Sequence, residues 1–238
     1  MVVRQAVNLM VAGSSPARAV LLIIMVIFDN SVFKLNPKLT WKTVDTPVAK
    51  VTIIEDYYED FDAVVRELDK LPGAITCCTI PNQMYEVRKS YASNMGGTHL
   101  PYCEQHTKLV QSIIGYDGLM HTEENLLINC NQLVSDHYKD HWYNTHQDIP
   151  RGYVGDRIST VVMLNESYAD GEGTNIYYPH ELTDELWIKR DTAERAFLAQ
   201  GKPNRAILFS SYLIHGISYD TDQFKDEIRY TQLILTSL

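Results

Sequence analysis

The chain has 238 residues, of which 45% are hydrophobic, and its formal net charge at pH 7 is −9. This length fits one large domain, and the hydrophobic content is sufficient for a core, which argues against wholesale disorder. No long run of lysine and arginine is present, whereas a nucleic-acid-binding surface normally carries a basic patch. We therefore expect no nucleic-acid partner.

Residues 1–35 differ in composition from the rest of the chain. Residues 1–24 contain no acidic residue, although the remainder carries all 30. The apolar run at 19–28 is too short for a transmembrane helix, which needs about 20 residues, and no small-residue cleavage site follows it. We expect residues 1–35 to be an extension that is non-native or disordered, with Met25 as a candidate true start. A signal anchor is the alternative.

The four cysteines form no C-x-x-C pair and match no zinc-binding pattern. They are Cys77, Cys78, Cys103 and Cys130. Their spacing indicates reduced, mostly buried thiols, as is usual in the cytosol. We expect a cytoplasmic protein that does not associate with a membrane.

From residue 48 the sequence has the pattern of a folded protein. Residues 51–54 are β-branched and apolar, which predicts a strand. Residues 56–71 carry apolar side chains at helical spacing and end at Pro72-Gly73, which predicts a helix. The next expected elements are a strand at 74–80, a polar loop near the active-site mouth at 85–99 and a second helix at 102–114.

The second half of the chain is rich in short, turn-separated segments of Val, Ile, Thr and Tyr. These segments favour an all-β sandwich or barrel in this half. Residues 182–199 are charged and amphipathic, and we expect them to form a helical insert. The expected strands are 126–136, 142–148, 158–165, 174–178, 205–210, 212–217 and 228–236.

A His-x-Asp step, His146 and Asp148, is the strongest chemical signal. In an extended segment residues i and i+2 share a face, so both side chains can reach one metal ion. His215 would complete a two-histidine, one-carboxylate triad, which is typical of non-haem Fe(II). His137 and His141 lie close to the motif and are competing ligands, although strand alternation would put His141 on the opposite face. A further alternative to His215 is His180, in a predicted loop.

Four other segments accompany this motif in a fixed order along the chain. They are Tyr143 in Tyr-x-x-His-x-Asp, Leu164-Asn165 followed by Gly171–Tyr177, Asn204–Ser210 before the distal histidine, and Arg229-x-Thr231. Together with the triad, these segments resemble the Fe(II)/2-oxoglutarate-dependent dioxygenases, in particular the prolyl-4-hydroxylase-like members. The resemblance covers residues 125–238 and, more loosely, 48–71; Glu172 and Tyr177 depart from the family's Gly-Gly-Thr-x-Phe pattern.

The resemblance implies a mainly β fold: a double-stranded β-helix (jelly-roll, cupin-like) core, buttressed by N-terminal helices, in a single domain at 48–238. It implies that His146, Asp148 and His215 hold Fe(II) and leave positions for 2-oxoglutarate and O2. Oxidative decarboxylation of the co-substrate would then give succinate and CO2. By the same analogy, the presence of Asp148 favours hydroxylation or desaturation over halogenation.

The resemblance also implies an anchor for the co-substrate. The guanidinium of Arg229 offers a planar donor fork to the distal carboxylate of 2-oxoglutarate, and Thr231 shares its strand face. Tyr143 would help to bind the co-substrate, or would simply pack. The alternative for Arg229 is a surface ion pair with Asp226 or Glu227.

Two other function classes compete with this hypothesis: a non-catalytic cupin-like protein that binds a metal or small ligand, and a metal-dependent hydrolase with a metal-bound water. The expected substrate is a small molecule or a peptidyl group. Residues 82–99 and 149–157 would flank the mouth of the site. Their cations would meet an anionic or peptide substrate, or would be solvated loop charges; they are Arg88, Lys89, Arg151 and Arg157.

Overall fold

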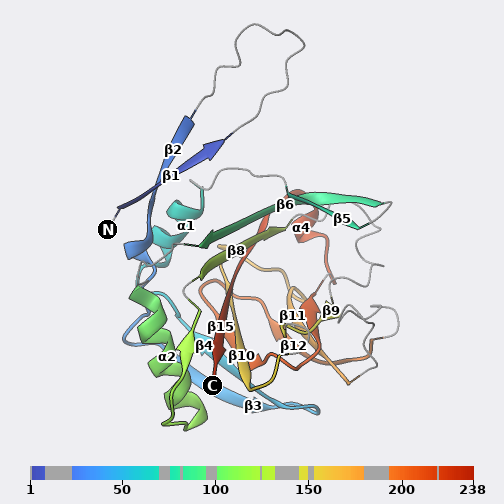
Figure 1. The fold of residues 1–238 in the computed structure, drawn as a ribbon. Coiled ribbons are helices and arrows are strands. Elements are labelled where there is room, and N and C mark those ends of the chain that lie inside the picture. The colour runs from blue at the N-terminus through green and yellow to red at the C-terminus, as the bar shows by residue number, and fades with distance from the viewer. Residues whose placement is uncertain are drawn as a thin grey trace, which may run out of the picture.

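The fold is known from a computed structural model (Figure 1). It describes residues 2–8, 23–69, 76–80, 83–94, 101–123, 125–131, 145–149, 153–179, 193–218 and 220–238. Side chains are described for residues 29, 31–68, 102–123, 145–149, 153–179, 193–218, 220–224 and 227–238.

The described chain is mainly β. Its first elements are β1 (Val2–Asn8), β2 (Ile23–Asp29), the 3-10 helix η1 (Asn30–Val32), β3 (Thr40–Asp45), β4 (Lys50–Glu55), α1 (Phe61–Asp69), β5 (Thr76–Ile80), β6 (Gln83–Asn94) and α2 (Pro101–Ile114). There follow β7 (His121–Thr122), β8 (Asn125–Asn131), β9 (Thr145–His146), β10 (Arg157–Met163), β11 (Gly173–Tyr177), β12 (Arg195–Gln200), β13 (Ala206–Ser210), β14 (His215–Ile217), α4 (Gln223–Asp226) and β15 (Arg229–Ser237).

The strands form two sheets and a separate hairpin, and every described strand pairing is antiparallel. The large sheet has the order β3-β4-β13-β10-β15-β8-β6-β5, with β7 paired to β15, and the small sheet has the order β12-β11-β14-β9. β1 and β2 form the hairpin. The prediction of a mainly β chain with flanking helices is confirmed at this level.

The central strands of the large sheet are covered on both faces. Ile53 and Phe209 belong to a core cluster that includes Ile176 of β11, in the small sheet. Their neighbours Ile54 and Leu208 belong to a second cluster, with residues of α1 and α2. Because adjacent strand residues point to opposite faces, the large sheet lies between the helices and the small sheet (Figure 1). The space between the two sheets holds the candidate site.

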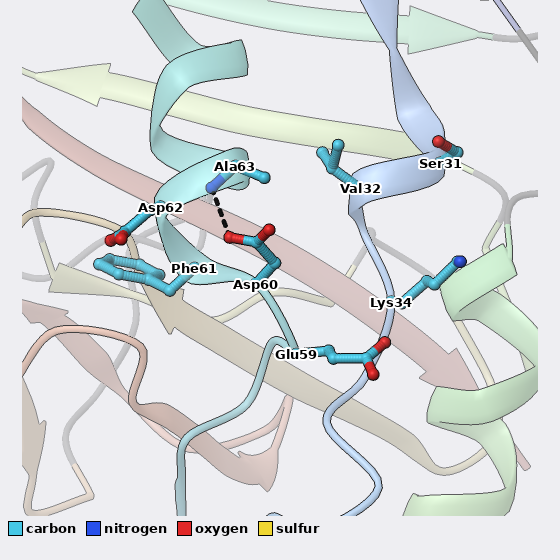
Figure 2. Close-up of a pocket in the computed structure, with 8 residues that line it drawn as sticks. All are labelled: Ser31, Val32, Lys34, Glu59, Asp60, Phe61, Asp62 and Ala63. Atoms are coloured by element: carbon cyan, nitrogen blue, oxygen red, sulfur yellow. Dashed lines mark hydrogen bonds between the residues drawn. The ribbon is translucent and has the colours of Figure 1, made fainter.

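The helix predicted at 102–114 is confirmed as α2, which begins one residue earlier. The helix predicted at 56–71 begins later, at Phe61. Asp60 explains this start, because its Oδ1 accepts a hydrogen bond of 2.9 Å from the Ala63 N–H (Figure 2), which is the role of an N-cap residue. The preceding Tyr57 and Tyr58 are fully buried outside the helix.

Two expectations about local structure are wrong. Residues 85–99 were expected to be a loop, but β6 (Gln83–Asn94) pairs with β8 through six residue pairs. In the insert expected to be helical at 182–199, residues 195–200 form β12, paired with β11; residues 180–192 lie outside the described part. Hydrogen bonds to a neighbouring strand outweigh the polar composition that suggested a loop and a helix.

The folded domain extends further toward the N-terminus than the predicted boundary at residue 48. Phe33 is completely buried, and Leu35, 8% exposed, forms an isolated bridge with Tyr58. Both belong to the cluster under the helices. Figure 2 shows the junction, where η1 and the following residues line one side of a pocket and Asp60–Ala63 line the other. The expected extension at 1–35 is therefore wrong for its last residues.

Within the described part of the chain, no helix has both the length and the apolar character needed to cross a membrane.

His106 on α2 makes stability depend on pH. It is completely buried, with Nδ1 2.8 Å from the Tyr57 hydroxyl and Nε2 3.2 Å from the Thr160 hydroxyl. Burial lowers the pKa of His106 to about 3, whereas an imidazole in the unfolded chain titrates near about 6.5. The neutral, buried imidazole therefore does not lower the free energy of unfolding above about pH 6.5. Between about pH 6.5 and pH 3 that free energy falls by about 1.4 kcal/mol for each pH unit of acidification.

Denaturant unfolding at about pH 7, 6 and 5 measures this effect. The free energy of unfolding of the wild type should fall more steeply with decreasing pH than that of His106→Gln, which has no titrating group at this position. Parallel pH profiles for the two proteins would contradict the assignment.

Candidate metal centre

Strand pairing in the small sheet brings two histidines together. β9 and β14 are antiparallel, and His146 lies directly opposite His215. The two imidazole ring centroids are 4.5 Å apart. After His146 the chain leaves the strand, and the Asp148 N–H donates to the Ser211 carbonyl oxygen at 3.1 Å. This bond turns the Asp148 carboxylate back toward the two rings.

The three predicted metal ligands meet at one point. Asp148 Oδ1 lies 3.3 Å from His146 Nε2, and Asp148 Oδ2 lies 3.3 Å from His215 Nε2. One ligand atom from each residue lies within 4.8 Å of the other two. Protein nitrogen and oxygen ligands lie about 2.0–2.2 Å from a bound zinc ion, so ligand pairs at this spacing suit one shared divalent ion. His137, His141, His180 and Tyr143 lie outside the described residues.

The Asp148 carboxyl favours the ionised form that a cation needs, whereas His215 must lose its proton before it can bind a metal. Burial disfavours the charged form of Asp148, but the two histidines outweigh it and hold the pKa of this carboxyl well below its usual value. Burial lowers the pKa of His215, but Asp148 outweighs burial and the net pKa is raised. His215 Nδ1 lies 3.0 Å from the Leu213 carbonyl oxygen. Only an N–H can bond to that carbonyl, so the neutral ring keeps the Nε2 lone pair for a metal.

Ser159 fixes the carboxylate from the opposite sheet. Its Oγ donates to Asp148 Oδ2 at 2.7 Å and lies 2.7 Å from Ser211 Oγ. Both serines are completely buried. The sequence analysis missed them. The sequence carries only a weak signal for Ser159, because β10 also contains the polar residues Arg157 and Thr160.

Replacement of Ser159 by Ala is expected to weaken metal binding by about 10- to 100-fold, the usual range when a partner of a metal ligand is lost. Anaerobic competition for Fe(II) against a chelating dye measures this affinity. Ser167→Ala is the matched control, because this exposed residue lies in the connection between β10 and β11, outside both sheets. Equal affinities in wild type and Ser159→Ala would contradict the role of Ser159.

A second buried polar group lies between the sheets. Arg229 on β15 is 2% exposed, and Thr231, two residues on, is 4% exposed. The guanidinium donates to the Thr231 hydroxyl at 3.5 Å and to the carbonyl oxygen of Gly173, on the small sheet, at 3.3 Å. Its Nε has no hydrogen-bond partner, and no carboxylate among the described side chains forms an ion pair with it. The alternative of a surface ion pair for Arg229 is therefore wrong.

The small sheet gives the spacing between the triad and Arg229. His215 pairs with Ile176, and further along β14 the Ser218 N–H donates to the Gly173 carbonyl oxygen at 3.0 Å. Ser218 lies three residues beyond His215 (218 − 215), which is about 10 Å at the rise of a strand. The guanidinium at Gly173 is thus separated from the triad by a span that a short, extended dicarboxylic acid can cover.

Asn165 holds the backbone on both sides of Arg229. Its Nδ2 donates to the Ile228 carbonyl oxygen at 2.7 Å, and its Oδ1 accepts from the Tyr230 N–H at 2.8 Å. Gly173 allows close contact on the other sheet, because a Cβ there would lie 2.1 Å from the Ala199 carbonyl oxygen. The Leu164-Asn165 motif thus fixes the backbone at Arg229, and the glycine motif leaves the space that a Cβ at position 173 would fill.

The expectation that Arg157 meets a substrate from a loop is wrong. Arg157 is 6% exposed on β10, forms an ion pair with Glu123 and donates to the Asp148 carbonyl oxygen at 3.5 Å. Burial lowers its pKa. Arg88 and Lys89 lie on β6, where side chains are not described, and Arg151 lies outside the described part. Of the four cysteines, Cys103 has a described side chain, which is buried and forms no disulfide.

No model of a known protein family matches the chain, and no curated protein matches it. The crystal structure of AviO1 from Streptomyces viridochromogenes Tue57 aligns with 88% of this chain and 93% of its own, at 11% identity and a TM-score of 0.46. The crystal structure of EvdMO1 aligns with 84% of this chain and 55% of its own, at the same identity and TM-score. Likeness at this level carries no argument about function.

Proposed function

We propose that the protein is an Fe(II)- and 2-oxoglutarate-dependent dioxygenase that hydroxylates a small-molecule or peptidyl substrate in the cytoplasm. The observation that carries the proposal is Arg229, a buried cation without a carboxylate partner among the described side chains, about 10 Å along the small sheet from the triad. A buried charge without a partner is costly. A bound anion would remove that cost.

The order of the strands supports a double-stranded β-helix core. Four central strands of the large sheet, β8-β15-β10-β13, face the four strands of the small sheet, β9-β14-β11-β12. From β8 to β15 the chain passes repeatedly between the sheets, with β11 and β12 as the one consecutive pair in the same sheet. Such alternation between two sheets supports a jelly roll.

Each residue then has a defined task. His146, Asp148 and His215 would hold Fe(II) on one side and leave the opposite side open, as two-histidine, one-carboxylate sites do. The iron, when bound, supplies O2 activation coupled to decarboxylation of the co-substrate. Arg229 and Thr231 would bind the distal carboxylate of 2-oxoglutarate and so orient its other end toward the triad. Ser159 keeps the Asp148 carboxylate in position.

Hydrolysis by a metal-bound water and metal binding alone give a buried guanidinium about 10 Å from the metal no role. A cupin-like protein that binds a small anionic ligand would use Arg229, and the absence of 2-oxoglutarate turnover would distinguish it. Asp148 occupies the position that halogenating members of the family leave open, so hydroxylation is the preferred outcome.

Succinate formation tests the proposal. Purified protein with Fe(II), 2-oxoglutarate and O2 should form succinate slowly even without its substrate, because such enzymes consume co-substrate in uncoupled turnover. Omission of iron, of O2 or of 2-oxoglutarate should abolish the product. Succinate formation that persists without iron, or no succinate from protein that has bound iron, would contradict the proposal.

A further inference from the structure

Glu172 is a buried acid beside the proposed anchor, and the following inference rests on the proposed function. It lies directly before β11, where the resemblance to the dioxygenases fails. Glu172 is completely buried. Its backbone is fixed on both sides, because its N–H donates to the Ala169 carbonyl oxygen at 3.1 Å and its carbonyl oxygen accepts from the Gly201 N–H at 2.6 Å.

Only one of the two carboxyl oxygens of Glu172 has a hydrogen-bond partner. Oε1 accepts a hydrogen bond of 2.5 Å from the Thr221 hydroxyl, whereas Oε2 has no hydrogen-bond partner. Arg229 acts electrostatically on this carboxyl, but the two side chains form no ion pair. Glu172 Oε2 and Arg229 Nε therefore both lack a hydrogen-bond partner, although their side chains interact electrostatically.

Several groups act on the charge of Glu172. Burial raises its pKa above the usual 4.5, the Thr221 hydroxyl and Arg229 lower it, and Asp220 raises it; the net pKa is raised. Asp220 itself pairs with Arg195. The other described titratable group that acts at this point is Tyr168, a buried phenol whose pKa is raised by burial and which also lies within the field of Arg229.

We propose that Glu172 is the second half of the carboxylate anchor and that it binds the anion in its protonated form. A protonated carboxyl can donate from Oε2 to the same carboxylate that Arg229 binds. An ionised Glu172 would instead repel it. A carboxylic acid that an apolar site keeps neutral in order to donate a hydrogen bond is a known arrangement in enzymes. Glu172 is thus a specificity residue for a dicarboxylate, and binding takes up one proton.

The sign of the pH effect follows from linkage. Free protein loses the Glu172 proton as pH rises through the raised pKa, whereas the bound state retains it. The Kd for 2-oxoglutarate should therefore be constant below that pKa and rise about tenfold per pH unit above it. In Glu172→Gln the amide N–H replaces the acid proton at every pH, so this source of pH dependence should vanish.

Anaerobic titration of the Fe(II)-loaded protein with 2-oxoglutarate from about pH 5.5 to 8 tests this inference. The ratio of the wild-type Kd to the Glu172→Gln Kd cancels the titration of the iron ligands, which both proteins share. We expect a ratio that increases from the acidic toward the alkaline end. A ratio that is constant with pH, or weaker binding by Glu172→Gln at every pH, would overturn the inference.

A second variant tests the inference independently. Thr221→Val removes the hydrogen bond that lowers the Glu172 pKa, so tight binding should extend to higher pH than in the wild type. An unchanged pH profile would count against the role of Glu172. If neither wild type nor variants bind 2-oxoglutarate at any pH although they bind Fe(II), the proposed function fails as well. If 2-oxoglutarate binds but its Kd shows no pH dependence from Glu172, the proposed function stands and only the role of Glu172 is refuted.

Discussion

Replacement of Asp148 by Ala is expected to abolish iron-dependent consumption of 2-oxoglutarate. The substitution removes the carboxylate that lies 3.3 Å from both His146 Nε2 and His215 Nε2, so two of three ligands remain. It also removes the carboxylate acceptor of the buried Ser159 hydroxyl, which costs stability rather than metal affinity. Succinate formation and Fe(II) affinity should both fall to background.

Asp156→Ala is the matched control for this variant. Asp156 is an exposed carboxylate on the same connection between β9 and β10. Its loss should leave succinate formation and Fe(II) affinity at the wild-type level. Thermal unfolding of the two variants shows that they are folded. Wild-type turnover by Asp148→Ala would show that the metal ligands have been assigned wrongly.

Replacement of Arg229 by Met is expected to raise the Kd for 2-oxoglutarate by about 10²- to 10³-fold. Removal of one partner from a buried charge pair usually costs about 3–5 kcal/mol, and about 1.4 kcal/mol corresponds to a factor of ten. Iron affinity should be unchanged, because the guanidinium contacts Gly173 and Thr231 but no metal ligand. Titration of 2-oxoglutarate into the Fe(II)-loaded variant measures the effect.

Arg229→Met should weaken co-substrate binding but should not lower the stability of the free protein. Arg229 has no ion-pair partner among the described side chains, so in the free protein its replacement by an apolar side chain should leave the free energy of unfolding unchanged or higher. Arg205 is the contrasting control, since it pairs with Glu55 at 2.5 Å. Arg205→Met should lower stability by about 1 kcal/mol without changing co-substrate affinity. Unchanged 2-oxoglutarate binding by Arg229→Met would refute the anchor.

The parts of the fold that the sequence predicts well are those with strong local patterns. The strands expected at 158–165 and 205–210 exist as β10 and β13 with boundaries shifted by at most two residues, because both are buried and rich in β-branched or apolar residues. β3 was missed. It is an edge strand that is exposed along nearly its whole length, so no alternation of apolar and polar residues marks it.

In the candidate site, too, some residues could be predicted from local sequence patterns and others could not. The His-x-Asp spacing correctly predicts that His146 and Asp148 lie together, but not through strand alternation, because β9 ends at His146 and the Asp148 backbone is held by the Ser211 carbonyl oxygen. Ser159 and Glu172 become part of the site only through tertiary contacts, with partners such as Asp148 and Thr221 that are 11 and 49 residues away in the chain. Arg157 shows the reverse error: a cation assigned to a loop is buried because tertiary structure supplies its acidic partner.

The central claim is that iron and 2-oxoglutarate bind together between the two sheets. Anaerobic addition of Fe(II) and then 2-oxoglutarate, followed by visible absorption, tests it most directly. The account predicts a metal-to-ligand charge-transfer band that requires both additions, disappears in His215→Ala and needs far more 2-oxoglutarate in Arg229→Met. Absence of the band from protein that has bound Fe(II), or the same band in His215→Ala, would contradict it.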